Sequence, residues 1–169
     1  MKYLFVLSFV IVFIFFDKSV GCTDTSPLWK HFTYMFQHAG VVHLIINSLA
    51  FIGMFRVLER VVNKYVLALS VLEIGFFASF LSSHEIPTVG ISGAVYAMAG
   101  IYLALIGSKK LIVKDRNKLY IYLFSINLCL TVSFFNPHSN FRLHVFSLIF
   151  GFIFWFPVEL YKNSKQNTV

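Results

Sequence analysis

Ser92 and His144 are the side chains in this sequence best placed for covalent chemistry, because each lies near the start of a long apolar run. A serine hydroxyl is a weak nucleophile and needs a base within hydrogen-bond reach. Gly90 and Gly93 flank Ser92, and they permit the irregular, closely packed backbone that such a site needs. We therefore expect Ser92 to act as a nucleophile at a helix N-terminus and His144 to act as its general base.

His43 and Asn47 lie four residues apart in another apolar run and therefore project from one face of a helix. Counted at about 1.5 Å per residue from the far ends of their runs, His43, Ser92 and His144 all lie about 24–26 Å deep. This shared level predicts one site. In it, His43, Asn47 and the backbone N–H of Ser92 would donate hydrogen bonds to an oxyanion.

Tyr96 and His38 would support this arrangement. Tyr96 follows Ser92 by one helical turn, so its ring can pack on the His144 imidazole and orient it. No Asp or Glu lies at this depth in any run, so we expect a dyad and not a triad. His38 would shape the oxyanion hole or hold water, or it would be an interfacial histidine that contacts solvent. Serine, histidine and asparagine inside apolar runs also serve as structural hydrogen-bonding groups between helices.

The chain that positions these groups has the composition of a membrane protein, with 58% apolar and 12% charged residues among 169. A soluble domain has about 45–50% apolar and about 25% charged residues. We expect an all-α polytopic membrane protein: one domain, 1–169, with six transmembrane helices. The expected spans are 3–16, 41–58, 65–81, 92–107, 119–135 and 143–161.

The first expected span is short, since its 14 residues fall below the roughly 17–25 that cross a bilayer. It also fits the apolar part of a cleaved signal peptide, or a lipoprotein signal ending at Cys22. Asp17 and Lys18 interrupt the approach to Cys22. We therefore expect the first helix to be retained.

Lysine and arginine orient the expected bundle, because cytoplasmic loops carry an excess of them. With both termini in the cytoplasm, the outer side keeps only Lys18, Lys30 and Arg142. The cytoplasmic side then holds Lys2, Arg56, Arg60, Lys64, Lys109, Lys110, Lys114, Arg116, Lys118, Lys162 and Lys165. Topology thus accounts for the net charge of +7, and no nucleic-acid partner is expected.

Three motifs resemble those of the rhomboid family of intramembrane serine proteases. His38-x4-His43-x3-Asn47 is similar to the signature of the family's second helix, and Gly90-Ile91-Ser92-Gly93 resembles its nucleophile motif. The segment from His144 to Gly151 resembles the His-x2-Gly-x3-Gly pattern of its sixth helix. The resemblance covers roughly residues 29–161, with the three motifs in family order.

The resemblance implies cleavage of membrane-anchored proteins in or beside their transmembrane segments, without a metal or organic cofactor. It also implies that the fifth helix gates access of substrate and water, and a bacterial inner membrane is the expected location. Two positions depart from the family pattern. Ser147 replaces the first glycine of the sixth-helix motif, and Lys30 stands where the family often has arginine.

Two other functions fit parts of the sequence. A rhomboid-like pseudoprotease would bind membrane proteins without cutting them, but such members usually lose the serine or the histidine. A small transporter or haem-binding membrane protein would use its histidines as relay groups or axial ligands. Haem would not need the Gly-x-Ser-Gly entry to a helix.

Overall fold

The computed structural model describes residues 1–82, 85–111 and 116–166. Lys114, which the charge pattern assigns to one side of the membrane, lies outside these residues. The elements are α1 (Lys2–Phe15), a 3₁₀ turn η1 (Lys18–Val20), α2 (Lys30–Thr33), α3 (Val41–Leu58), α4 (Lys64–Leu81), α5 (Ser92–Gly107), α6 (Arg116–Phe135) and α7 (Phe141–Gln166). The described part of the chain is all-helical, as the sequence predicts, apart from one isolated bridge between Cys22 and Thr88.

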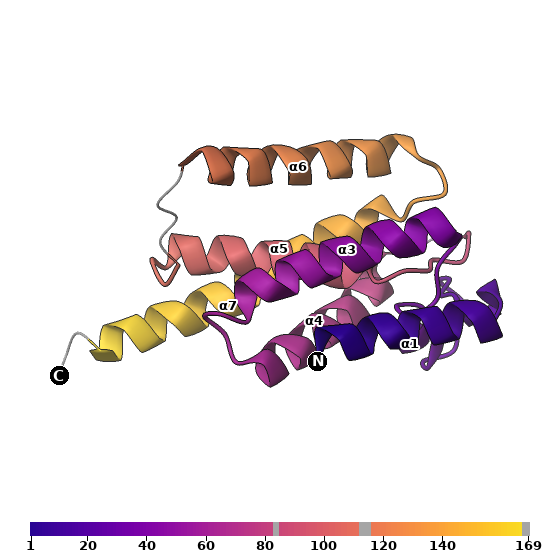
Figure 1. Ribbon diagram of the computed structural model, residues 1–169, viewed down its shortest axis with the longest axis horizontal. Coiled ribbons are helices and arrows are strands. Elements are labelled where there is room, and N and C mark those ends of the chain that lie inside the picture. The colour runs from indigo at the N-terminus through magenta and orange to yellow at the C-terminus, as the bar shows by residue number, and fades with distance from the viewer. Residues whose placement is uncertain (83–84, 112–115, 167–169) are drawn as a thin grey trace.

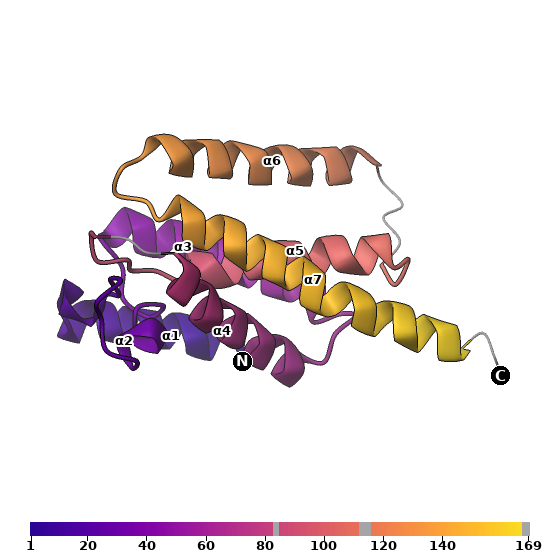
Figure 2. The same ribbon diagram turned by 180° about the vertical axis from the view of Figure 1, so that it is seen from behind.

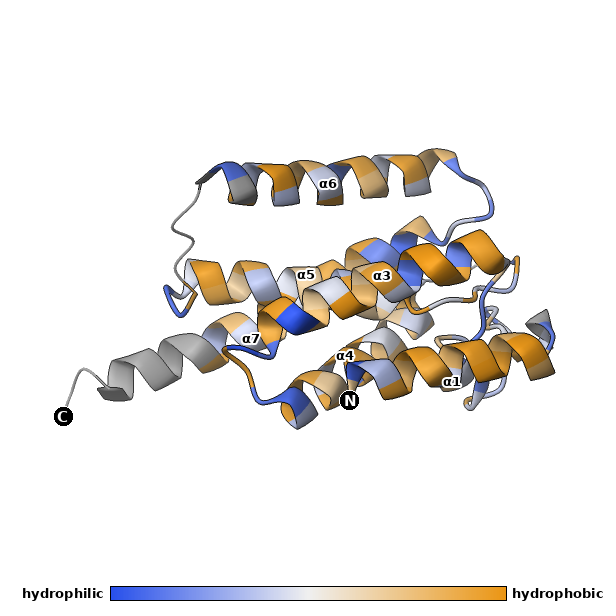
Figure 3. Cartoon of the chain, viewed as in Figure 1, coloured by the Kyte–Doolittle hydropathy of each residue, from blue (hydrophilic) through white to orange (hydrophobic). Residues whose placement is uncertain are grey.

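Three described helices are long and apolar enough to cross a membrane: α3, α4 and the first part of α7, Phe141–Val158. The apolar helices Lys2–Phe15, Ser92–Gly107 and Leu119–Phe135 are shorter. Apolar residues run along the long helices (Figure 3), and many large apolar side chains are exposed, among them Val42 and Ile46 on α3. Such a surface suits contact with lipid.

The centre of the bundle is α5, which packs against α3, α4 and α7 (Figure 1). Small residues allow its closest approach, which is to α7. A Cβ atom added at Gly100 would lie 2.0 Å from the carbonyl oxygen of Leu148, and one added at Gly151 would lie 2.2 Å from that of Ala97. The backbones of α5 and α7 are therefore in direct contact, which fixes the helices that carry Ser92 and His144.

The first helix is built into the bundle. Phe9 is fully buried, with its ring 5.7 Å from that of Phe51 on α3. Lys2 forms an ion pair with Glu59 at the far end of α3. The Gln37 side chain donates hydrogen bonds to carbonyl groups at the C-terminal end of α1. These contacts tie α1 to α3 at both ends.

The sixth helix is the least attached element: α6 stands off from the other helices in both ribbon views (Figures 1 and 2). Nearly all its described side chains are exposed or only half-buried, and Ser133 is the buried exception among them. The start of α1 and the described end of α7 lie toward the same end of the bundle as the α3–α4 connection (Figure 1). The opposite end holds the starts of α3, α5 and α7, and there Ser92 and His144 meet.

Candidate active site

The structure brings Ser92 and His144 into direct contact. Ser92 is the first residue of α5, and His144 lies in the first turn of α7. His144 Nε2 lies 2.8 Å from Ser92 Oγ. The ring of Tyr96 stacks on the imidazole, with ring centres 4.5 Å apart and planes 26° apart. A hydroxyl within hydrogen-bond reach of an oriented imidazole is the arrangement that activates a nucleophile.

The backbone before Ser92 adopts a conformation that requires glycine. Gly90 has φ of 118°, which L residues rarely adopt, and its N–H donates to the carbonyl oxygen of Tyr34 at 2.9 Å. A Cβ atom at Gly90 would lie 2.9 Å from Cε1 of His43 and 3.1 Å from Nδ2 of Asn47. The bare backbone of Gly90 therefore lets both side chains approach the segment that leads into Ser92.

His43 and Asn47 are thus neighbours, as their spacing on α3 predicts. The N–H of Ala39 donates to Nδ1 of His43 at 3.3 Å, so the proton of the neutral ring lies on Nε2. Asn47 is buried, and its Nδ2 has no hydrogen-bond partner among the described residues. Two side-chain donors are therefore free beside the nucleophile segment.

His38 is buried, at 2% exposed, so it is not the solvent-contacting surface histidine that the sequence leaves as an alternative. Its ring lies 5.3 Å from that of His43 and 5.6 Å from that of Phe9. Neither of its ring nitrogens has a partner in the described part of the chain. His38 therefore places two unpaired ring nitrogens next to His43. Phe9 on α1 packs against the His38 ring.

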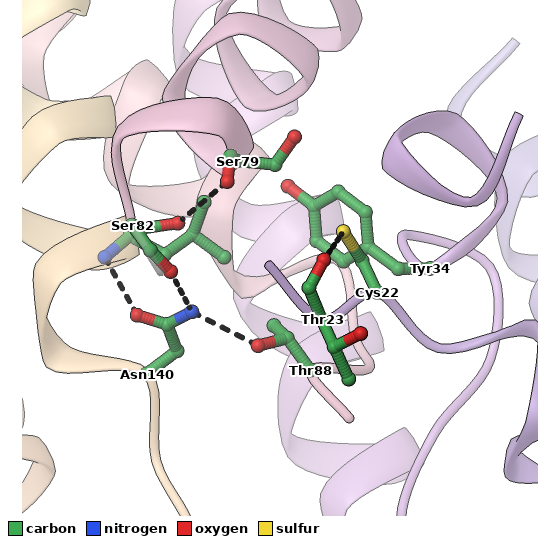
Figure 4. A pocket seen from close by; sticks show the side chains of 8 residues that line it. Cys22, Thr23, Tyr34, Ser79, Ser82, Thr88 and Asn140 are labelled. Atoms are coloured by element: carbon green, nitrogen blue, oxygen red, sulfur yellow. Dashed lines mark hydrogen bonds between the residues drawn. The ribbon is translucent and has the colours of Figure 1, made fainter. Parts of the chain in front are cut away.

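The segment before Ser92 is held by hydrogen bonds to residues far away in the sequence. No local sequence pattern predicts these bonds. Cys22 and Thr88 exchange backbone hydrogen bonds of 3.0 and 2.8 Å. The Asn140 side chain, just before α7, donates to the carbonyl oxygen of Ser82 at 3.0 Å and to Oγ1 of Thr88 at 2.9 Å (Figure 4). Its Oδ1 accepts from the N–H of Leu143. Asn140 therefore connects the start of α7 to the segment that leads into α5.

A second polar cluster lies behind this connection, where Nδ1 of His31 is 3.2 Å from Sγ of Cys22 and 2.8 Å from Oγ of Ser79. Burial raises the pKa of the Cys22 thiol to about 11 and lowers the pKa of His31. The thiol is therefore protonated and the imidazole neutral at pH 7. The cluster is held by neutral hydrogen bonds, and it anchors α2 on α4.

The scan against family models matches residues 25–159 to the rhomboid domain. The chain belongs to the rhomboid family. A rhomboid domain implies a membrane-embedded helical bundle, in keeping with the apolar helices described above. The match includes Ser92, His144 and the segments that position them.

Several curated rhomboid proteins are similar to the chain. The putative rhomboid protease YdcA of Bacillus subtilis is 29% identical over 76% of this chain and 66% of its own length. The putative rhomboid protein L523 of Acanthamoeba polyphaga mimivirus is 26% identical over 100% of this chain and 98% of its own length. The rhomboid protease GluP of Bacillus subtilis is 27% identical, and the alignment covers only 33% of that protein. The chain thus spans just under two thirds of one such relative and a third of another.

The structure shows the contacts of Ser147 and Lys30, the two residues that depart from the rhomboid pattern. Ser147 on α7 is fully buried, and its hydroxyl has no partner among the described residues. A Cβ atom at Gly93 would lie 3.4 Å from this hydroxyl, so the serine fits against the start of α5.

The ammonium of Lys30 lies over the Trp29 ring, 5.5 Å from its centre. Lysine therefore makes a cation–π contact in the segment between α1 and α3.

Proposed function

We propose that this rhomboid protein is an intramembrane serine endopeptidase that cleaves membrane-anchored proteins in or near their transmembrane segments. The 2.8 Å contact between His144 Nε2 and Ser92 Oγ carries the proposal. Among the curated relatives, GluP is named a rhomboid protease and YdcA a putative rhomboid protease, which supports the proposal.

In the proposed reaction, Ser92 Oγ attacks the scissile carbonyl carbon while His144 Nε2 takes the hydroxyl proton. His144 then gives this proton to the leaving amine, and a water molecule activated by the same imidazole hydrolyses the acyl-enzyme. Tyr96 holds the ring in the orientation that both transfers need. The chemistry uses no metal or organic cofactor.

The oxyanion of the tetrahedral intermediate would accept from His43 Nε2–H, Asn47 Nδ2–H and the backbone N–H of Ser92. The amide of Ser92 lies at the N-terminus of α5, where backbone donors have no acceptor within the helix. One such donor is typically worth about 10²–10³ in rate. His38 supports this hole from behind His43, while Gly90 and Gly93 keep the backbone close to it.

We further propose that 1–169 is a single membrane domain in which α1, α3, α4, α5, α6 and α7 each cross the bilayer. Both termini would face the cytoplasm, in a bacterial inner (plasma) membrane. The packing of Phe9 against α3 supports retention of α1, and the excess of basic residues on the side of the termini supports the orientation. The partners are transmembrane substrates and lipid, with no nucleic acid.

The proposal is tested by gel-based cleavage of a model transmembrane substrate by the detergent-solubilised chain. Ser92→Ala and His144→Ala should each abolish cleavage. Ser125→Ala is a matched control, because Ser125 is exposed on α6 and, among the described residues, its hydroxyl donates only to the carbonyl oxygen of Ile121. If the folded wild-type chain cuts none of several helix-destabilised substrates but retains them on a column, the chain is a pseudoprotease. A Soret band in the purified protein would instead favour haem binding.

A further inference from the structure

Ser133 is the one buried residue among the described side chains of α6, at 5% exposed. Its Oγ lies 2.8 Å from Nδ1 of His144, the ring nitrogen that does not face Ser92. The same Oγ lies 2.7 Å from Oγ of Ser139, in the connection between α6 and α7. A continuous line of hydrogen bonds thus runs from Ser139 through Ser133 and His144 to Ser92.

The role of His144 as a general base determines which atom donates and which accepts in each of these hydrogen bonds. His144 can take the Ser92 proton only if Nε2 is unprotonated, so the proton of the neutral ring must be on Nδ1. Nδ1–H then donates to Ser133 Oγ, and the Ser133 hydroxyl proton is free to be donated to Ser139 Oγ. In a triad, a buried carboxylate holds the histidine in this tautomer. The described residues offer His144 no carboxylate, and a hydroxyl occupies that position.

We propose that Ser133 is a positioning residue that holds His144 in the tautomer competent for catalysis, with Ser139 directing the Ser133 hydroxyl. This inference rests on the proposed protease function. Under this proposal, α6 contributes to the chemistry, because His144 keeps its Nδ1 partner only while α6 is docked on α7. Among the described side chains, the other ring contacts of α6 include Tyr122 against Tyr102 and Phe134 against Phe141.

The test compares wild type, Ser133→Ala, Ser133→Thr and the control Ser125→Ala. Ser133→Ala should lower kcat about tenfold, the order expected for losing one neutral hydrogen bond, with KM unchanged. Ser133→Thr retains the hydroxyl and should restore most of the loss. Ser125→Ala should behave as wild type. Ser139→Ala should cause a smaller loss than Ser133→Ala, because it removes only the group that directs the Ser133 proton.

A second readout does not depend on cleavage. With isotope-labelled histidine, proton–nitrogen correlation spectra report which ring nitrogen is protonated, and His144→Ala identifies the His144 signals. Wild type should show the proton on Nδ1, whereas Ser133→Ala should show a mixture of the two tautomers. An unchanged tautomer together with an unchanged kcat in Ser133→Ala would overturn the inference. Wild type with the Nδ1 tautomer but no cleavage would count against the protease function alone.

Discussion

The contact between α5 and α7 makes a quantitative prediction at Gly100. An alanine there would place Cβ 2.0 Å from the carbonyl oxygen of Leu148 and 2.7 Å from the amide nitrogen of Phe152. Ordinary van der Waals contact begins at 3.4 Å, so the two backbones must separate by about 1.4 Å. Both neighbours are backbone atoms of α7, so no side-chain rotation can relieve the clash.

This displacement would lengthen the 2.8 Å contact between Ser92 and His144, since Ser92 begins α5 and His144 lies in the first turn of α7. A misplacement of about 1 Å costs on the order of 10²-fold in rate, and overpacking costs about 1–3 kcal/mol in stability. We expect Gly100→Ala to lose about 100-fold in kcat for a transmembrane substrate and to unfold at a lower temperature.

Gly53→Ala is the matched control, because a Cβ atom there meets nothing within 4 Å. Gly53 also lies inside a helix, α3, where alanine should add about 0.5–1 kcal/mol of stability. Its cleavage rate should equal that of wild type. A Gly100→Ala protein with the wild-type kcat would refute the reasoning, since it would show that the dyad does not depend on the spacing of α5 and α7.

Three further substitutions test other parts of the structure. Gly90→Ala should reduce cleavage at least tenfold, because φ of 118° costs an L residue about 1–3 kcal/mol and the new Cβ would crowd His43; normal cleavage by a folded protein would contradict this. Ser147→Ala should raise the free energy of unfolding by about 1 kcal/mol, because it removes a buried hydroxyl without a described partner; a loss of stability would reveal a partner for that hydroxyl. His31→Phe tests pH dependence. Because burial lowers the pKa of His31 below 6.5, protonation favours the unfolded state and stability falls as pH drops below about 6.5. Phenylalanine can keep the ring stacked on Phe80, so the unfolding temperature should depend less on pH in this range; an unchanged pH slope would show that His31 does not contribute.

The sequence predicts the helices well where apolar runs end at strong local signals. Pro87 and Gly90 interrupt the chain before Ser92, and α5 begins at Ser92 as expected. The bounds of α7 differ more: a span of 143–161 is predicted, whereas the helix runs from Phe141 to Gln166 and continues through Pro157. An apolar run marks what lipid can cover, but a helix can continue into water beyond that limit.

In the candidate site too, the sequence predicts what lies within one helix and not what joins separate helices. The spacing of His43 and Asn47, and of Ser92 and Tyr96, is local to one helix, so helical periodicity places each pair on a face. Ser133 was missed because the apolar residues of α6 do not gather on one face, so its sequence does not indicate which face meets α7. The bonds of Asn140 join segments more than fifty residues apart, and no local pattern encodes them.

The direct backbone contact between α5 and α7 also has a consequence for synthesis of the protein. Ser92 and His144 are 52 residues apart in sequence, and α7 is the last of the described helices to leave the ribosome. Until it emerges, the small-residue face of α5 lacks its contact with α7, and Ser92 lacks its contact with His144. A chain that stops before α7 would therefore lack the proposed catalytic pair. The pair would assemble only after α7 has been inserted, which would protect neighbouring membrane proteins during translation.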